Sequence, residues 1–343
     1  MRAAIVGCGN IAAVHAQSIE KLEGADLAAV ADILPERAAA YAKKYGCHAY
    51  DSLEEMLERE RPDVLHICTP HYLHVPMAGC ALKKGIHVFS EKPPVISRKQ
   101  LECLEEAVSG AQARAGFCFQ NRYNPSVLFV KELLASGKPG RIKGARGIVT
   151  WNRTETYYTE SGWRGKLETE GGGALINQSI HTMDLLGFFL GKPLSVEAQT
   201  ANHHLRGVIE VEDMMEAYIR YESAAACFYA TTAYTEDAPP IIELSCENMV
   251  IRIEDMDVTL QYGDGRRERP EIAGKQAMGK SYWGSGHLDC IADFYNCLET
   301  GRRYAQDLDG VRDTVRLMLG AYESAAGRGK EISVSGSGWG RKG

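Results

Sequence analysis

Short apolar runs alternate with helix-type patterns over the first third of the chain. The apolar runs cover residues 2–6, 27–31, 64–68, 87–90 and 115–120, and the helix-type patterns cover 11–22, 36–45 and 72–84. Ser52 with Glu55 and Ser97 with Gln100 have the spacing of helix caps, which predicts a further helix after each serine. Short strands separated by helices indicate a parallel sheet built from right-handed crossovers.

The pattern changes after about residue 121, where longer strands alternate polar and apolar positions. Strands are predicted at 148–151, 215–221, 226–232 and 241–253, the last split by a turn at 247–248, and helices at 126–135, 175–190, 288–298 and 311–325. Such alternation fits an antiparallel sheet with one covered face. We therefore expect an α/β chain with domains at 1–121 and 122–334 and a flexible tail at 335–343.

The composition is that of an ordinary globular protein and narrows the choice of function. The 343 residues suggest about two domains, 45% of them are hydrophobic and 24% charged, and the net charge is −6. Basic residues form no patch, and no apolar run approaches the roughly 20 residues that span a bilayer. The chain opens on a strand pattern rather than a signal peptide, which predicts a cytoplasmic protein that binds neither nucleic acid nor membrane.

The ten cysteines do not have the spacing of a metal site. No two of them form a C-x-x-C pair, and most lie inside apolar strand or helix patterns. A zinc site requires clustered ligands. We therefore interpret them as reduced core cysteines and expect no metal.

A glycine turn follows the first predicted strand and opens a helix. Gly7 permits a tight turn, Gly9 lets a pyrophosphate approach the backbone, and Ala12 still allows close packing of helix on strand. Asp32 lies 20 residues beyond Ala12, at the end of the next strand, where its carboxylate can accept hydrogen bonds from a ribose. The alternative is a plain strand–helix turn, but strand, turn, helix, strand and acid together predict a dinucleotide site.

The residues after the acid indicate which dinucleotide is bound. Ile33 and Leu34 follow Asp32, and neither side chain could pair with a 2′-phosphate. We therefore expect NAD in preference to NADP.

Two polar clusters follow predicted strands, at residues 68–74 and 90–94. Ligands bind at the carboxyl ends of the strands of such a sheet, so both segments are candidates for a site. The two histidines of the first cluster could instead cap a helix or lie on the surface. The charged pair Glu91–Lys92 in the second could be a surface salt bridge, although two prolines follow it at the end of a buried strand.

A polar stripe interrupts a strongly apolar helix in the second half of the chain. Asn177, His181 and Asp184 are spaced at i, i+4 and i+7, so they share one face of a helix that follows the glycine run 171–173. Polar groups on a buried helix must be satisfied internally or line a cavity. A satisfied core histidine is one interpretation and a site is the one we favour. Metal binding by His181 and Asp184 lacks a third close ligand.

With these residues in place, the chain resembles the Gfo/Idh/MocA family, named after glucose–fructose oxidoreductase, inositol dehydrogenase and a rhizopine-catabolism protein. The marks are residues 7–11 with His15, Thr69-Pro70 with His74, Glu91-Lys92-Pro93, and the glycine run 171–173 with His181 and Asp184. The resemblance implies a Rossmann domain that binds NAD(P) and a second α/β domain built on an open, mostly antiparallel sheet. It also implies a substrate beside the nicotinamide. The cofactor-binding residues that it implies are Gly7, Gly9, Asn10, Ile11, Asp32, Thr69, Pro70, His74 and Glu91.

The same resemblance assigns catalytic roles. Lys92 matches the family's lysine that contacts the reacting hydroxyl, and His181 matches its acid/base histidine. Asn177 stands where many members carry an aspartate, and because an asparagine cannot exchange a proton it departs from a carboxylate-assisted relay. Residues 177–181, with Tyr157-Tyr158 and 163–165, look like a branch that includes UDP-N-acetyl-hexosaminuronate 3-dehydrogenases.

Further polar and aromatic residues are candidates for substrate binding. They are Arg122, Tyr123, Tyr158, Trp163, Arg164 and Asp184. The two arginines could equally make hydrogen bonds between domains, and Tyr158 and Trp163 could simply pack. His287 is expected to cap a helix, with a role in the site as the alternative.

These expectations define a function and a mode of assembly. The resemblance implies an NAD-dependent oxidoreductase that acts on a secondary alcohol of a sugar, sugar nucleotide or cyclitol. An NAD-dependent glycoside hydrolase and a non-catalytic, nucleotide-dependent regulator are the alternatives. Large residues on the predicted strands, Tyr218, Phe228 and Tyr229, suggest a sheet face left to be covered, so a homodimer or homotetramer is expected.

Overall fold

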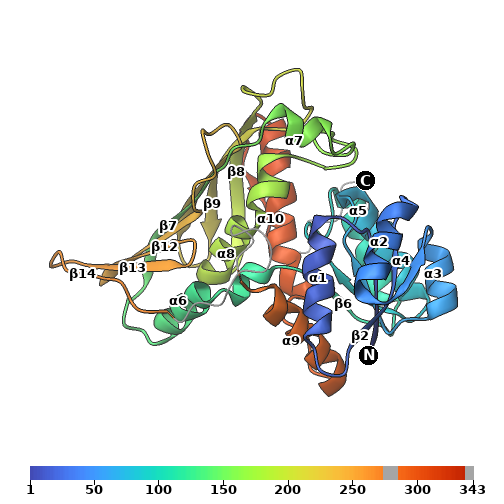
Figure 1. Ribbon diagram of the computed structural model, residues 1–343. Helices are drawn as coiled ribbons and strands as arrows, with labels where there is room; N and C mark the ends of the chain where they lie inside the picture. Colours follow the sequence, from blue (N-terminus) through green and yellow to red (C-terminus); the bar gives the residue numbers. More distant parts are fainter. Residues whose placement is uncertain (273–284, 337–343) are drawn as a thin grey trace. The chain divides into compact units, whose positions relative to one another are not determined.

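The computed structural model describes residues 1–272 and 285–336, and the chain forms two compact units (Figure 1). The first unit contains residues 1–120 and 286–311, and the second contains the described parts of 121–285 and 312–343. Both units mix helices with strands, so the α/β class expected from the sequence is confirmed.

The first unit is built on a six-stranded sheet in the order β3-β2-β1-β4-β5-β6, with all neighbours parallel. Its strands are β1 Arg2–Val6, β2 Asp26–Ala31, β3 His48–Tyr50, β4 Val64–Ile67, β5 His87–Ser90 and β6 Ala115–Phe117. Its α-helices are α1 Asn10–Glu20, α2 Pro35–Tyr45, α3 Leu53–Glu60, α4 His74–Lys83, α5 Arg98–Ser109 and α9 His287–Thr300. This strand order is that of a Rossmann fold, and the parallel sheet expected from the sequence is confirmed.

Two of the helices begin at the expected caps. The side-chain oxygen of Ser52 accepts a hydrogen bond from the N–H of Glu55 at the start of α3, at 3.3 Å. That of Ser97 accepts one from the N–H of Gln100 at the start of α5, at 3.2 Å. Each bond satisfies a donor that the first turn of a helix leaves without a partner in the helix.

The helix α9 belongs to the first unit, whereas the expected division assigned it to the second. Arg114, which precedes β6, donates hydrogen bonds to the carbonyl oxygens of Cys297, Gly301 and Arg302 at 2.7–3.0 Å. A Cβ atom on Gly116 would lie 2.7 Å from the ring of Phe294, so helix and strand are in close contact. An apolar helix face predicts burial but does not reveal which sheet covers it.

The second unit is built on a nine-stranded sheet in the order β14-β13-β12-β11-β7-β10-β9-β8-β15. Its strands are β7 Ile142–Thr150, β8 Pro193–Ala201, β9 Met214–Tyr221, β10 Ala225–Thr231, β11 Ile241–Cys246, β12 Met249–Glu254, β13 Asp257–Tyr262, β14 Arg267–Glu268 and β15 Ile332–Ser333. Among the described strands of this sheet, β7 and β10 are the one parallel pair, and the other neighbours are antiparallel. The sheet is therefore mostly antiparallel, as expected, and the predicted turn at 247–248 joins β11 to β12.

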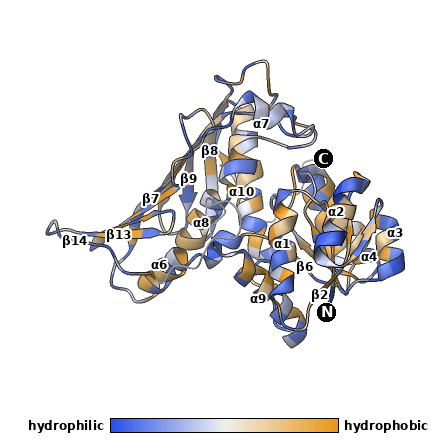
Figure 2. Cartoon of the chain, in the orientation of Figure 1, coloured by the Kyte–Doolittle hydropathy of each residue, from blue (hydrophilic) through white to orange (hydrophobic). Residues whose placement is uncertain are grey.

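Helices cover one face of this sheet. The α-helices of the unit are α6 Pro125–Ala135, α7 Glu155–Thr159, α8 Ile180–Leu190 and α10 Leu308–Ala326, which continues from the first unit. A Cβ atom on Gly147 of β7 would lie 3.1 Å from Leu186 of α8, and the hydroxyl of Ser324 in α10 accepts a hydrogen bond from the N–H of Ala198 in β8. Hydrophobic and hydrophilic residues alternate along the strands, as a sheet with one covered face requires (Figure 2).

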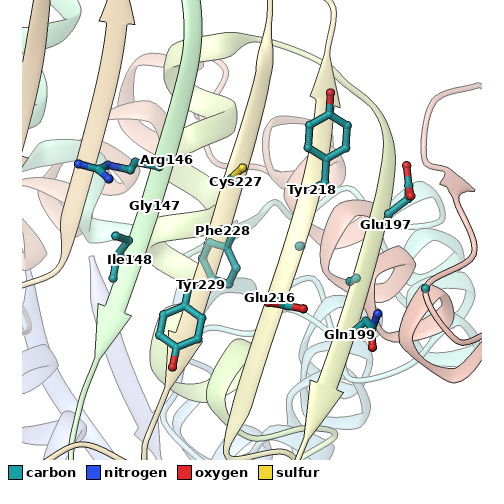
Figure 3. A pocket seen from close by; sticks show the side chains of 13 residues that line it. Arg146, Gly147, Ile148, Glu197, Gln199, Glu216, Tyr218, Cys227, Phe228 and Tyr229 are labelled. Carbon is teal, nitrogen blue, oxygen red and sulfur yellow. The ribbon is translucent and has the colours of Figure 1, made fainter.

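The described residues leave the opposite face of the sheet open, and it carries a shallow depression (Figure 3). Tyr218 and Cys227 are paired across β9 and β10 on this face, and Tyr218 is 45% exposed. Phe228, which we expected on the same face, pairs with Ala217 on the covered side and is only 2% exposed. The expectation for Phe228 was wrong because consecutive side chains of a strand point to opposite faces.

Two further findings concern the ends and the helices of the chain. Residues 337–343 of the expected flexible tail lie outside the described residues. Among the helices in the described parts of the chain, none has both the length and the apolar character needed to cross a membrane.

Candidate active site

The turn between β1 and α1 has the geometry of a phosphate-binding loop. Gly7 has φ of +88°, and a Cβ atom there would lie 2.7 Å from the carbonyl oxygen of Cys68, so the turn requires glycine. Gly9 is the N-cap of α1, and no described atom lies within 4 Å of where its Cβ would be. Ala12 is fully buried behind the turn, whereas Asn10 and Ile11 are at least partly exposed in front of it. The helix N-terminus can therefore hold a pyrophosphate.

Asp32 lies at the end of β2, beside this turn. Its carboxylate accepts hydrogen bonds from the N–H of Cys8 at 2.7 Å and from the N–H of Leu34 at 2.9 Å. These two bonds fix its orientation and leave lone pairs for ribose hydroxyls. Ile33 is 86% exposed next to it and offers no positive charge to a 2′-phosphate. The residues of this turn thus fit NAD.

The cluster after β4 is held by His74. One ring nitrogen of His74 lies 2.8 Å from the carbonyl oxygen of Pro93 and the other 2.9 Å from that of Thr69. His74 is only 1% exposed, and burial lowers its pKa. Its place is therefore behind the site, where it joins two loops, while Thr69 and Pro70 are partly exposed.

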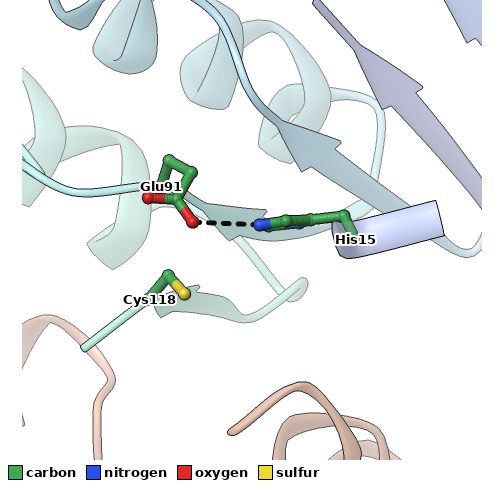
Figure 4. Close-up of side chains that lie close together, drawn as sticks. All are labelled: His15, Glu91 and Cys118. Atoms are coloured by element: carbon green, nitrogen blue, oxygen red, sulfur yellow. Dashed lines mark hydrogen bonds and ion pairs between the residues drawn. The ribbon is translucent and has the colours of Figure 1, made fainter. Parts of the chain in front are cut away.

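Glu91, which follows β5, is the end of a buried chain of hydrogen bonds, and Figure 4 shows the first of them, to His15. Glu91 Oε1 lies 3.0 Å from His15 Nε2, His15 Nδ1 lies 2.9 Å from His66 Nδ1, and His66 Nε2 lies 2.9 Å from the hydroxyl of Tyr295. With Glu91 ionised and both histidines neutral, only one proton arrangement satisfies every contact. Tyr295 then donates to His66, His66 to His15, and His15 to Glu91.

The charge of Glu91 is stabilised by this chain. Burial raises the pKa of Glu91, but the hydrogen bond from His15 and the charge of Lys92 lower it below its usual range. Lys92 follows directly, is partly exposed, and its backbone N–H lies 3.3 Å from Glu91 Oε2. Glu91 is 6% exposed, so its surroundings fit a positioning role beside Lys92 better than direct cofactor contact.

His15, Glu91 and Cys118 form the one group of possible metal ligands among the described residues, with ligand atoms within 4.8 Å of one another (Figure 4). Metals bind cysteine as the thiolate. Burial raises the pKa of Cys118 well above its usual value, which disfavours the thiolate. His15 and Glu91 are already bonded to each other. The cluster is therefore best described as a hydrogen-bonded part of the core.

In the second unit, the predicted helix at 175–190 is two elements. A π-helix, Ala174–Ser179, precedes α8. Cβ atoms on Gly172 and Gly173 would lie 2.0 Å from the hydroxyl of Tyr322 and 2.1 Å from the carbonyl oxygen of Glu212. The glycine run therefore permits close packing of the backbone at the start of the π-helix.

The three residues of the polar stripe have different partners. Asn177 donates from Nδ2 to Glu170, whereas Asp184 accepts two hydrogen bonds from Arg122 and one from Thr314. Asp184 is 1% exposed, so our expectation that it binds substrate is not supported, and Arg122 is its ion-pair partner. His181 lies in the first turn of α8 and is partly exposed, as is Asn177.

The remaining aromatic candidates separate into packed and exposed residues. Tyr158 is 3% exposed and belongs to a small core cluster with Leu205, Ile209 and Val211, so it packs rather than stacks on a ligand. The guanidinium of Arg164 lies 4.6 Å from the ring centre of Tyr157 and 4.8 Å from that of Trp163. Trp163, Arg164 and Tyr123 are partly exposed and stay candidates.

Two buried groups correct or extend the sequence analysis. His287 is 1% exposed and is not the cap of α9, whose N-cap is Gly286. Burial lowers the pKa of His287 to about 4. Glu170, which the sequence analysis missed, is fully buried, and burial raises its pKa to about 7. Glu170 lies in a polar stretch of the sequence, where an acid is ordinarily solvated. No periodic pattern of apolar positions there predicts that it is buried.

Comparison with known proteins gives matches in both units. A family model described as "Oxidoreductase family, NAD-binding Rossmann fold" matches residues 1–118, and one for the GFO/IDH/MocA C-terminal domain matches residues 127–252. The crystal structure of the WlbA dehydrogenase from Bordetella pertussis, in complex with NADH and UDP-GlcNAcA, has a TM-score of 0.84 and 29% identity, covering 97% of this chain and 98% of that chain.

Curated relatives match over a shorter length. The D-glucoside 3-dehydrogenase of Escherichia coli is 31% identical over 56% of this chain and 55% of its own. The inositol 2-dehydrogenase of Rhizobium meliloti is 28% identical over 59% of this chain and 58% of its own. The chain thus spans little more than half the length of these relatives.

Proposed function

Since the chain belongs to the GFO/IDH/MocA family of oxidoreductases, we propose that it transfers a hydride between NAD and a secondary alcohol of a sugar, sugar nucleotide or cyclitol. The observation that carries the proposal is the turn at Gly7 and Gly9 with Asp32 fixed beside it, which fits NAD. The similar proteins named above act on or bind compounds of these three kinds. We propose NAD rather than NADP because Asp32 would oppose a 2′-phosphate.

The chemistry requires a proton to leave the hydroxyl as the hydride leaves the carbon. Bound nicotinamide supplies the hydride acceptor at C4. His181 is proposed as the general base, because a histidine has an ordinary pKa of about 6.5 and can take a proton near neutral pH. Lys92 is proposed to orient the oxygen and to stabilise the negative charge that develops on it.

Asn177 and Arg164 are proposed to bind the substrate. Asn177 can exchange hydrogen bonds with a hydroxyl but cannot take its proton. Arg164 is held by two aromatic rings, which leaves the donors at the rim of its guanidinium for a carboxylate, phosphate or hydroxyl. Trp163 and Tyr123 complete this set of partly exposed candidates.

The experiment that tests the proposal is turnover in variants. A screen of sugars, cyclitols and UDP-sugars for NAD reduction supplies the substrate. His181→Ala and Lys92→Ala should each lower kcat by roughly 10²- to 10⁴-fold, the usual effect of removing a positioned base or charge, while NAD still binds. Asp184→Asn is the comparison variant, because it weakens a buried ion pair. It should lower the stability of the fold more than it lowers kcat. Near-normal kcat in His181→Ala would place the base elsewhere.

The open face of the nine-stranded sheet supports self-association. It carries Tyr218, which is half exposed, together with Ile148, Cys227 and Tyr229 around a shallow depression, beside the charged Glu197 and Glu216 (Figure 3). Exposed apolar groups rimmed by polar residues are typical of interfaces. We propose that a second copy of the chain covers it in a homodimer or homotetramer. Light scattering should give a multiple of 37.7 kDa, and Tyr218→Glu should shift the mass toward the monomer. A wild-type monomer at micromolar concentration would contradict the assembly.

We propose a cytoplasmic location on the basis of the cysteines. All ten are free thiols; six are buried as expected, whereas Cys103 and Cys227 are exposed. Free thiols are usual in reducing compartments. The assignment can be checked by fractionation of the source cells with an antibody against the protein.

A further inference from the structure

A buried carboxyl group lies directly behind Asn177. Glu170 is fully buried, and its two oxygens face different donors. Oε1 accepts a hydrogen bond from Asn177 Nδ2, and Oε2 accepts one from the N–H of Gly165 at 2.5 Å. The side chain thus links a rigid loop to a residue of the proposed substrate site.

The loop side of this link cannot readily shift. Gly165 has φ of +78°, and a Cβ atom there would lie 2.7 Å from Ile209, so the backbone is packed closely. Its carbonyl oxygen accepts a hydrogen bond from the N–H of Glu210 at 2.7 Å. The Gly165 N–H is therefore a fixed donor that always requires an acceptor oxygen from residue 170.

We infer that Glu170 is a positioning residue that determines which end of the Asn177 amide faces the substrate. The inference rests on the proposed function. An ionised carboxylate can only accept hydrogen bonds, so Asn177 must turn its –NH₂ inward and present Oδ1 outward. Asn177 then offers a substrate hydroxyl the acceptor that an aspartate would offer, while the negative charge stays on Glu170.

Protonation of Glu170 would reverse this arrangement. The oxygen that faces Gly165 must stay an acceptor, so the added proton resides on the oxygen that faces Asn177. Asn177 would then accept through Oδ1 and present its –NH₂ to the substrate. Glu170 thereby makes the hydrogen-bond polarity of the site depend on pH.

The groups around Glu170 bring this change near neutral pH. Burial and the charge of Glu212 raise the pKa of Glu170, the hydrogen bonds from Gly165 and Asn177 and the charge of Arg164 lower it, and the net value is about 7. The other titratable groups that face this cluster are Tyr157, Tyr158 and Tyr322. Burial raises the pKa of Tyr158 and Tyr322, so their hydroxyls stay neutral in this range.

Glu170→Gln isolates the effect without changing the size of the side chain. The N–H of Gly165 must bond the oxygen of the introduced amide, so the –NH₂ of that amide faces Asn177. The Asn177 side chain then turns its Oδ1 inward and its –NH₂ outward at every pH. Glu168→Gln, on an exposed acid two residues earlier, is the matched control for charge. Asn177→Asp is the rescue, because the introduced carboxylate presents one oxygen to the new amide and the other to the substrate.

The first test is independent of any substrate. In ¹⁵N-labelled protein the side-chain NH₂ signal of Asn177, identified by its loss in Asn177→Asp, should shift with a midpoint near pH 7 between about pH 5.5 and 8.5. The shift should persist in Glu168→Gln and vanish in Glu170→Gln. A signal that does not move in the wild type, or moves equally in Glu170→Gln, overturns the inference.

The second test uses the alcohol that the screen identifies. Glu170→Gln should lower kcat/KM by about 10- to 100-fold, the usual effect of presenting a donor where an acceptor is needed, with thermal stability and NAD affinity close to wild type. Adding Asn177→Asp to Glu170→Gln should recover most of this loss. Losses that multiply in the double variant contradict the inference. If no alcohol reduces NAD, the proposed function fails, and the NMR titration still decides the role of Glu170.

Discussion

Asp32 illustrates how one side chain can select a cofactor. Its carboxylate is fixed by the N–H groups of Cys8 and Leu34, so it cannot swing away from a larger ligand. A 2′-phosphate would bring like charge against it, and close contact between like charges costs on the order of several kcal/mol.

We therefore expect the wild-type protein to bind NAD more tightly than NADP, and Asp32→Ala to narrow the difference. Asp26→Ala, at the exposed opposite end of the same strand, should leave it unchanged. Fluorescence titration with both cofactors measures the ratio. Equal affinities in the wild type would show that Asp32 does not face the ribose.

At the scale of an element, the start of the π-helix depends on two residues without side chains. Gly173→Ala should lower the free energy of unfolding by roughly 1–3 kcal/mol or more, because its Cβ would lie 2.1 Å from the backbone oxygen of Glu212. Gly187→Ala, in α8, meets its nearest atom only at 3.9 Å and should be neutral or slightly stabilising. Urea unfolding of the two variants provides the comparison. Equal stability of both would mean that the loop relaxes freely.

Elements with a strong local pattern could be predicted from the sequence. The glycine turn, the buried parallel strands and the hairpin at 247–248 depend on neighbouring residues, and they were found where expected. β8 and β13 were missed because each buries only a few apolar residues among polar ones, which gives a weak alternation. The π-helix was missed because its first turn is determined by distant groups, Tyr322 and Glu212.

The sequence supplied the candidate residues of the proposed site, but not the hydrogen bonds and ion pairs that they form. Lys92, His181 and Asn177 stood out by motif and spacing. The ion pair between Asp184 and Arg122, 62 residues apart, could not be predicted from the sequence around either residue. Glu170 is close to Asn177 in sequence, but only folding reveals that it is buried.

At the scale of the whole molecule, buried histidines make stability depend on pH. Burial lowers the pKa of His66 and of His287, in the latter case to about 4, so the fold keeps these two histidines neutral. The unfolded chain protonates them below an ordinary pKa of about 6.5. The free energy of unfolding is therefore highest above about pH 6.5 and falls as the pH drops toward 4. The part of this loss that His287 causes is roughly 3 kcal/mol.

The melting temperature should therefore fall steadily between about pH 6.5 and 4, and less steeply in His287→Gln. His204→Gln, at an exposed position, is the control and should follow the wild type. Calorimetry over this range provides the measurement. An unchanged slope in His287→Gln would show that His287 is protonated in the folded protein.

The first unit is completed by residues 286–311, and this has a consequence for the newly made chain. When residue 120 leaves the ribosome, the surface at Gly116 still lacks Phe294 and Tyr304. At about 5–20 residues per second, the ribosome needs roughly 10–40 s more to reach residue 311. During that interval the nascent Rossmann sheet exposes apolar surface that chaperones can bind. Gene fusions or fragments cut at residue 121 would retain that exposed surface permanently.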